Sequence, residues 1–247
     1  MANKSDATLS NNVANFNELI ISVNGFGTAY NPTKESLKIP ALLALQAETN
    51  QVMETFYAAM AANKNAIAAR DARQKLLSPL VTRVKNAVAA TDTTQQVDDQ
   101  VKSIVRKILG QRVSVKKTGE ELKALQDAGK EVKQVSSSQM GLDARIDNFS
   151  KLITLLESIS LYNPNEEELK VPALINFINE LKSLNTAAIK SANELNNARI
   201  NRDRILFGEN TGICDIATSV KTYVKSVFGS TSPQQKQLGG LRFTRKK

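Results

Sequence analysis

The chain has 247 residues, a formal charge of +9, no histidine and a single cysteine, and only 5% of its residues are aromatic. Without histidine, one chain cannot supply a histidine-dependent catalytic triad, an imidazole general base, or a zinc or haem site made of cysteine and histidine ligands. Eleven glycines and six prolines are few for this length, so the composition favours long helices over a turn-rich all-β fold.

The single thiol, Cys214, cannot form an intramolecular disulfide, and nothing in the cysteine usage indicates an oxidising compartment. It lies between Ile213 and Ile216 in an apolar helical pattern, which predicts a small buried side chain in preference to a reactive thiol. The first residues lack the apolar segment of a signal peptide, and no stretch is long and apolar enough to span a bilayer. We therefore expect a cytoplasmic protein without membrane insertion.

A segment of thirteen residues occurs twice in the chain. Tyr30–Leu42 reads YNPTKESLKIPAL and Tyr162–Leu174 reads YNPNEEELKVPAL, so nine of the thirteen positions are identical at an offset of 132 residues. The simplest interpretation is a tandem duplication of one helical unit. Residues 1–137 then form the first helical repeat, which ends in a connecting helix at about 118–135, and residues 138–247 form the second.

Each predicted repeat starts with a short amphipathic helix and continues with a long one. Apolar residues spaced three and four apart predict the short helix at about residues 9–23 and again at about 142–156. The proline of the repeated Tyr-Asn-Pro segment forces the residue before it into an extended conformation, which ends the short helix. Pro40 and Pro172 fit the first turn of the long helix, where a missing backbone N–H costs nothing.

The long helix carries an apolar seam whose positions alternate steps of three and four, as in a helical bundle or coiled coil. The two copies of the seam are Leu42, Leu45, Thr49, Val52, Phe56, Ala59, Asn63 and Ala66, and Leu174, Phe177, Leu181, Leu184, Ala188, Ser191, Leu195 and Ala198. Both copies then reach an Arg-Asp pair, Arg70-Asp71 and Arg202-Asp203. The repeated pair predicts a salt bridge to another helix; a catalytic carboxylate is the alternative, although no acid–base partner can be named for it.

A third helix is expected in each repeat. In the first repeat it should start at Ser78-Pro79, a capping residue followed by proline, and in the second near Thr211-Gly212. The first repeat then has about thirteen extra residues, in which the polar run 91–96 predicts a loop or a helix break. The copies rejoin in the last helix, which ends at Gly110 and Gly229.

Apolar residues alternate with polar or basic ones after each of these glycines, as in Val113 and Val115 and in Leu241 and Phe243. This spacing predicts a short extended arm or strand, and one arm could pair with the other. The expected fold class is therefore all-α: a tandem duplication of a long-helix bundle, with short extended arms after the last helix of each repeat.

Three consecutive acids, Glu166, Glu167 and Glu168, precede the second long helix. They could bind a metal ion, but the first copy has Lys-Glu-Ser at the same positions, 34–36. Negative charge ahead of the positive end of a helix is the better interpretation. We expect no metal, cofactor or small-molecule site.

The positive charge is concentrated at the equivalent end of each predicted repeat. Between residues 101 and 119 there are six basic residues and no acid, and after Asp215 there are seven basic residues and again no acid. These two segments hold +13, which leaves −4 for the remainder of the chain. The thirteen side chains form the candidate site for a polyanion or a protein partner: Lys102, Arg106, Lys107, Arg112, Lys116, Lys117, Lys221, Lys225, Lys236, Arg242, Arg245, Lys246 and Lys247.

Two interpretations of these basic segments remain open. They could bind nucleic acid or another polyanion, with an affinity that is largely electrostatic and falls with salt. They could instead be solvated helix faces and a basic tail that aids solubility or docks on an acidic face of a neighbouring subunit. Few aromatic residues accompany the charge, and no helix-turn-helix, zinc-finger or RNA-binding sheet signature is present, which favours the second interpretation.

An enzyme is not expected, because the sequence contains no recognisable nucleophile or acid–base set and no phosphate-binding glycine loop. The sequence favours a non-catalytic structural or protein-interaction module that assembles with copies of itself through its duplicated surfaces, or binds another protein. Nucleic-acid or polyanion binding through the basic ends of the two repeats is the alternative.

Overall fold

The computed structural model describes residues 4–111 and 141–245, and their fold is all-helical with no strand among them. The α-helices are α1 (Lys4–Gly25), α2 (Ile39–Ala89), α3 (Gln95–Leu109), α5 (Leu142–Glu157), α6 (Val171–Phe207), α7 (Ile213–Phe228) and α8 (Pro233–Gly239). Short 3-10 helices lie between them: η1 (Gly27–Ala29), η2 (Glu35–Leu37) and η3 (Glu167–Leu169). The predicted all-α class is confirmed. None of the described helices combines the length and the apolar character that a membrane span requires.

The chain folds into two compact units. Unit 1 consists of Met1–Lys64 and Lys190–Lys247, and unit 2 consists of Asn65–Ile189. The long helices α2 and α6 each contribute one part to each unit. Each unit has its own apolar core, and each core takes side chains from both predicted repeats. The compact units therefore do not follow the boundary between residues 137 and 138, which stays a prediction about sequence repetition.

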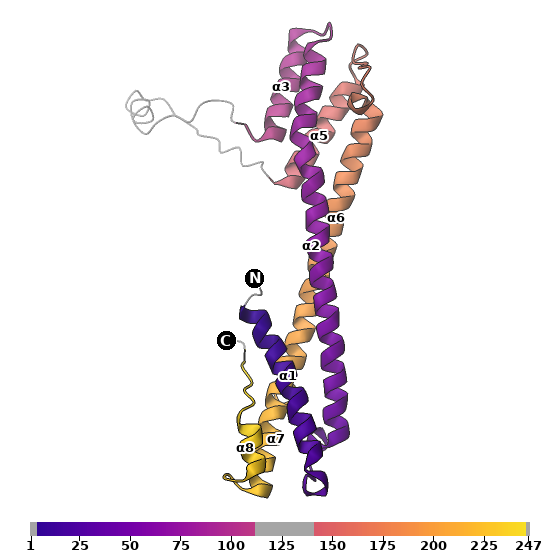
Figure 1. The fold of residues 1–247 in the computed structure, drawn as a ribbon. Coiled ribbons are helices and arrows are strands. Elements are labelled where there is room, and N and C mark those ends of the chain that lie inside the picture. The colour runs from indigo at the N-terminus through magenta and orange to yellow at the C-terminus, as the bar shows by residue number, and fades with distance from the viewer. Residues whose placement is uncertain (1–3, 112–140, 246–247) are drawn as a thin grey trace, which may run out of the picture. The chain divides into compact units, whose positions relative to one another are not determined.

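Unit 1 contains α1, α7 and α8, which pack together beside the first part of α2 and the last part of α6 (Figure 1). Two aromatic pairs connect α7 with the segment that follows α1. Phe26 meets Phe228 and Tyr30 meets Tyr223 edge to face, with ring centroids 5.5 and 5.3 Å apart. Unit 2 contains α3 and α5, which pack against each other and against the remaining parts of α2 and α6.

Within each unit the parts of α2 and α6 run antiparallel and are joined by cross-helix contacts. These contacts are Glu48 with Arg204 (3.1 Å) and Asn63 with Ser191 (3.2 Å) in unit 1, and Arg73 with Glu180 (2.6 Å) in unit 2. Arg83 of α2 also pairs with Glu168 of η3, just before α6, at 2.6 Å. The predicted seam is the face that these helices bury: Leu42, Leu174 and Leu181 are completely shielded from solvent. A polar seam residue such as Thr49 is satisfied locally, because its hydroxyl donates to the carbonyl of Leu45 at 2.7 Å.

The prediction that a third helix starts at Ser78-Pro79 is wrong, because α2 continues through Pro79 to Ala89. The apolar stripe of the helix explains why it continues. Burying an aliphatic side chain stabilises by about 1.5–3 kcal/mol, so several such side chains outweigh the roughly 3 kcal/mol that an interior proline costs. Four stripe residues around Pro79 are at most 1% exposed: Leu77, Val81, Val84 and Val88. In the second half α7 does start at Ile213, after Gly212, as predicted.

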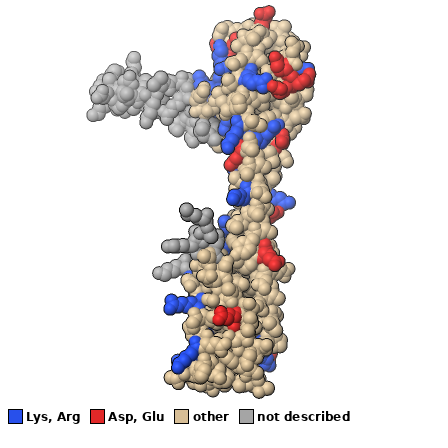
Figure 2. All heavy atoms as spheres, in the orientation of Figure 1, with Lys and Arg blue, Asp and Glu red and all other residues tan. Residues whose placement is uncertain are grey.

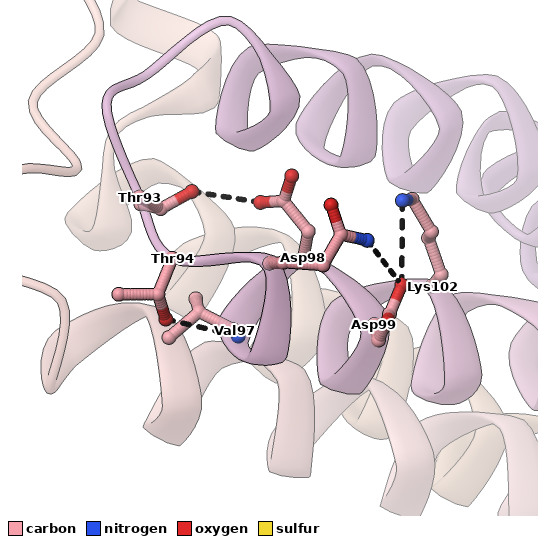
Figure 3. Close-up of polar contacts among 7 residues, drawn as sticks. Thr93, Thr94, Val97, Asp98, Asp99 and Lys102 are labelled. Atoms are coloured by element: carbon pink, nitrogen blue, oxygen red, sulfur yellow. Dashed lines mark hydrogen bonds and ion pairs between the residues drawn. The ribbon is translucent and has the colours of Figure 1, made fainter.

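The predicted helix break in residues 91–96 is confirmed, since it falls between α2 and α3. Thr94 is the N-cap of α3, and its hydroxyl accepts a hydrogen bond from the backbone N–H of Val97 at 3.4 Å (Figure 3). Thr93 donates to the carboxylate of Asp98 at 2.7 Å, which holds a negative charge near the positive end of the helix. The polar run therefore serves as a capping segment.

The repeated Tyr-Asn-Pro segment has the same local structure in both places. Tyr30 and Tyr162 are buried, and each donates its hydroxyl to the backbone carbonyl seven residues later, that of Leu37 or Leu169, at 2.8 Å. A 3-10 helix, η2 or η3, and then the start of a long helix follow each tyrosine. Burial raises the pKa of both phenols, to about 12 for Tyr162, and nearby groups add less.

Replacing Tyr162 by phenylalanine is expected to lower the free energy of unfolding by about 1–2 kcal/mol at neutral pH, because the buried carbonyl of Leu169 loses its partner. The penalty should shrink by about 1 kcal/mol near pH 11. The reason is that the tyrosine of the unfolded chain ionises above about pH 10, whereas the folded protein holds its proton until about pH 12, so the wild type loses stability in this window. Urea unfolding at the two pH values measures both effects.

The control for this experiment is Tyr57→Phe, because Tyr57 is 38% exposed and its hydroxyl contacts that of Ser10, at 3.2 Å, in an exposed position. This change should alter the free energy of unfolding by less than about 0.5 kcal/mol at neutral pH. A penalty for Tyr162→Phe that is the same at neutral pH and near pH 11 would contradict the prediction.

The C-terminal part of unit 1 differs from expectation. An unpredicted helix, α8, follows α7, and its N-cap Ser232 accepts a hydrogen bond from the N–H of Gln235 at 3.1 Å. The predicted second arm comes after this helix: residues 241–245, which we call the C-terminal segment, form no strand and run back beside α1 (Figure 1). The first predicted arm, with Val113 and Val115, and the predicted connecting helix at about 118–135 lie outside the described residues.

Candidate partner-binding site at the C-terminal segment

The structure places the candidate basic residues in both units. Helix α3 of unit 2 carries Lys102, Arg106 and Lys107. Unit 1 carries Lys221 and Lys225 on α7, Lys236 on α8, and Arg242 and Arg245 in the C-terminal segment. The other five candidates lie outside the described residues: Arg112, Lys116, Lys117, Lys246 and Lys247. On the face drawn in Figure 2, lysine and arginine side chains are scattered among neutral residues, with acidic side chains between them. The described residues form no continuous basic surface on that face.

The basic residues of α3 are partly engaged within unit 2. Lys102 pairs with Asp99, with 3.5 Å between Nζ and Oδ1, and Gln95 donates to the same carboxylate oxygen at 3.0 Å (Figure 3). The Nε of Arg106 is buried and has no hydrogen-bond partner among the described residues. An exposed pair such as Lys102 with Asp99 contributes little to stability, so Lys102 stays available to an external anion.

The C-terminal segment is held along α1 by two asparagine side chains. The amide of Asn12 donates to the carbonyl of Thr244 at 2.8 Å and accepts from the N–H of the same residue at 2.9 Å. Asn15, one helical turn further on, donates to the carbonyl of Arg242 at 2.7 Å. Side chains of a helix therefore supply the backbone partners that a neighbouring strand would supply in a sheet.

Helix α7 holds the other side of the C-terminal segment. Leu241 is buried in the core of unit 1, and Phe243 packs against that core. The ammonium group of Lys221 donates to the carbonyl of Leu241 and lies 5.4 Å from the centre of the Phe243 ring. Burial lowers the pKa of Lys221. Lys221 is thus part of an intramolecular contact rather than of a free basic surface.

An acid and a thiol at the start of α7 complete the contact. Asp215 pairs with Arg245, and its second carboxylate oxygen accepts from the backbone N–H of Asn210 at 2.9 Å. Cys214 is 2% exposed, which confirms the prediction of a buried side chain, and its Sγ lies 3.7 Å from the amide of Asn12. Burial raises the pKa of the thiol to about 11, against a smaller opposing effect of Arg245. The thiol is therefore protonated at neutral pH.

Two of the three acids in the run 166–168 are paired with basic side chains. Glu167 contacts Lys170 at 2.5 Å and Glu168 contacts Arg83 at 2.6 Å. Across residues 4–111 and 141–245, no group of three or more histidine, cysteine or acidic residues could hold a metal ion. An open cleft of about 510 Å³ lies beside this loop in unit 2, lined in part by Arg83 and Asn165, and its openness suits weak polar contacts better than an enclosed ligand.

The repeated Arg-Asp pairs, for which a salt bridge to another helix is predicted, form hydrogen-bonded pairs between neighbouring residues of one helix. Arg70 donates to Asp71 at 2.8–3.0 Å, and Arg202 donates to Asp203 at 2.6–2.9 Å, so each arginine pairs with the residue that follows it. The planar guanidinium of Arg202 also lies over the ring of Phe56, 4.3 Å from its centre. Its role is to pack between α6 and α2 in unit 1.

Sequence reasoning missed the two asparagines that hold the C-terminal segment. Four asparagines lie within seven residues of α1, at positions 11, 12, 15 and 17, although asparagine is a poor helix former. The spacing of three residues between Asn12 and Asn15 places both on one face of α1, and Asn12 is 1% exposed. Two asparagines at a buried edge of a helix are therefore the signal that could have found this site.

Comparison of the chain with protein-family models, with curated proteins and with solved structures found no match. The functional interpretation therefore rests on the chain's own residues and their geometry.

Proposed function

We propose that the chain is a non-catalytic protein-interaction module, built by tandem duplication of one helical unit, which associates with copies of itself. The observation that carries this proposal is the repeated joint before each long helix. In both places a buried tyrosine donates to a carbonyl seven residues later at 2.8 Å, and a lysine pairs with a glutamate three residues earlier at 2.5 Å. Matching contacts at an offset of 132 residues support a common origin of the two halves.

The composition of the compact units supports self-association. Unit 1 combines the joint of the first predicted repeat with α7 of the second, and unit 2 combines the joint of the second with α3 of the first. Each predicted repeat thus needs helices of the other to complete a core. A chain whose repeats complete each other in this way can also exchange such elements with a second copy, which is the low-cost route to dimers known as domain swapping.

Polyanion binding, the alternative, has less support. Two of the five described candidate side chains in unit 1, Lys221 and Arg245, hold the chain's own C-terminal segment. The aromatic residues near the remaining three are engaged within unit 1: Phe243 packs against the core, and Tyr223 and Phe228 pair with Tyr30 and Phe26. The positive charge is better explained by contacts with protein.

Size-exclusion chromatography with light scattering, across a range from micromolar to millimolar protein, tests the proposal. The weight-average mass should rise with concentration from that of one chain towards that of two, because association is a mass-action equilibrium. The rise should persist in high salt, since an association driven by polyanion contaminants would be lost there. The mass of a single chain at every concentration would contradict the proposal.

A further inference from the structure

The C-terminal segment is bound as an extended peptide is bound by a receptor. Asn12 pairs with both backbone groups of Thr244, at 2.8 and 2.9 Å, and Asn15 pairs with the carbonyl of Arg242 at 2.7 Å. A side-chain amide carries one acceptor and a donor group, so it matches the hydrogen-bonding groups of a peptide unit whatever side chain that unit bears. These contacts fix the position and direction of the segment along α1.

Side-chain contacts add specificity to this backbone recognition. Leu241 is 6% exposed in the core of unit 1, and Phe243 lies under the ammonium group of Lys221. Arg245 pairs with Asp215, whose side chain is only 15% exposed. The arrangement therefore selects an apolar residue, an aromatic residue two positions later and an arginine two positions after that. We call Asn12, Asn15, Asp215 and Lys221 the docking site.

Gly239, the last residue of α8, and Gly240 come directly before the C-terminal segment. A Cβ atom added to Gly239 or Gly240 would meet nothing within 4 Å, so packing does not explain why glycine stands at either position. Glycine does give the chain more backbone conformations than any other residue. Leu238, just before them, is completely buried and anchors α8. The segment can therefore leave the docking site by rotation at the two glycines while α8 stays in place.

We propose that the docking site binds, in trans, the C-terminal segment of a second copy of the chain. This inference rests on the proposed self-association and names the contact that produces it. An exchanged segment makes the same contacts as the chain's own, so exchange costs no interaction. The chain's own segment competes at an effective concentration on the order of millimolar, as for other short tethers, so exchange between wild-type chains is weak and requires high protein concentration.

Two full-length variants test this contact by complementation. The first, Leu241→Ala with Phe243→Ala, keeps the docking site and loses the anchors of the segment. The second, Asn12→Ala with Asn15→Ala, keeps the segment and loses its backbone partners. Each variant alone should have the mass of one chain by light scattering. Their mixture should form a two-chain complex at a protein concentration at least about tenfold below that at which the wild type associates, because neither chain competes for its own segment.

A synthetic peptide with the sequence of residues 238–247 provides a second measurement on the same variants. Fluorescence anisotropy should show that the labelled peptide binds the Leu241→Ala, Phe243→Ala variant, and that it binds the Asn12→Ala, Asn15→Ala variant at least about tenfold more weakly. A peptide of the same composition in scrambled order is the control for simple charge attraction. Circular dichroism checks that each variant has kept the helix content of the wild type.

The outcomes distinguish this inference from the proposed function. If the wild type associates but the mixture of variants does not, the docking site is not the contact, and the inference fails while self-association stands. If the peptide binds but the mixture stays at the mass of one chain, the site does not accept the segment of a second chain, and the inference also fails. If the mixture associates while the wild type stays monomeric at every concentration, the contact is correct and the proposed function is wrong.

Discussion

Replacing Arg202 by alanine is expected to lower the free energy of unfolding by about 3 kcal/mol, the lower end of the range for breaking a buried charge pair. The side chain of Arg202 is only 7% exposed, and it donates two hydrogen bonds to Asp203 while its guanidinium covers the ring of Phe56. Alanine removes the stem that packs between the helices, the stack on the ring and the ion pair with the carboxylate. Asp203 is 34% exposed, so water can solvate its carboxylate and offset part of the lost stability. Urea unfolding followed by circular dichroism measures the difference.

Arg70 is the matched control, because it forms the same adjacent pair, with Asp71, at the equivalent position of the other long helix. Its side chain is 27% exposed and that of Asp71 is 47% exposed, so Arg70→Ala should cost less than about 1 kcal/mol. A double-mutant cycle with Phe56→Leu isolates the stack, and the coupling energy between Arg202 and Phe56 should be about 1–2 kcal/mol. Equal losses at Arg202 and Arg70 would show that burial does not distinguish the two pairs.

Periodicity predicted much of this fold because burial follows it. Ten of the sixteen seam positions of the long helices, such as Leu42 and Leu174, are buried, and the other six are partly buried. The repeated Tyr-Asn-Pro segment does join a short helix to a long one. An apolar stripe at helical spacing has to be buried whichever helix packs against it, so the periodicity predicts the buried face without identifying the partner helix. The prolines at positions 40 and 172 lie in first turns for the same local reason.

Local signals failed where burial competed with them. Ser-Pro occurs at 78–79 and at 232–233, and only the second starts a helix, α8. The first lies within a run of buried apolar residues in register with α2, whereas the second follows Gly229 and small polar residues that no core requires to be helical. A capping signature therefore has to be weighed against the apolar stripe on both sides of it.

The candidate site could be predicted only in part. Charge counting found the basic residues near the C-terminus, but it could not show that Lys221 and Arg245 hold the chain's own C-terminal segment. That contact joins residues more than 200 positions apart, Asn12 and Thr244, and no local pattern encodes which distant segments meet. The sequence could not predict which helices form each unit for the same reason, because the antiparallel pairing of α2 with α6 depends on contacts between distant parts of the chain.

Replacing Pro79 by alanine is expected to raise the free energy of unfolding by about 2 kcal/mol. Proline inside a helix costs about 3 kcal/mol, because it cannot donate to the carbonyl four residues earlier, that of Lys75, and its ring crowds the same carbonyl. Up to about 1 kcal/mol of this gain is offset, because alanine makes the unfolded chain more flexible than proline does. Pro79 is exposed, so the substitution removes no core packing.

The controls for Pro79→Ala are Pro40→Ala and Pro172→Ala, which change prolines in the first turns of α2 and α6. These prolines interrupt no helical hydrogen bond, so alanine should leave stability unchanged or lower it by up to about 1 kcal/mol through the entropy of the unfolded chain. The three variants thus separate an interior proline from an initiating one by the sign of the change. A loss of stability for Pro79→Ala like that of the other two variants would contradict this prediction. A rise in stability for Pro79→Ala alone would establish that burial of the apolar stripe carries α2 past a residue that disfavours it.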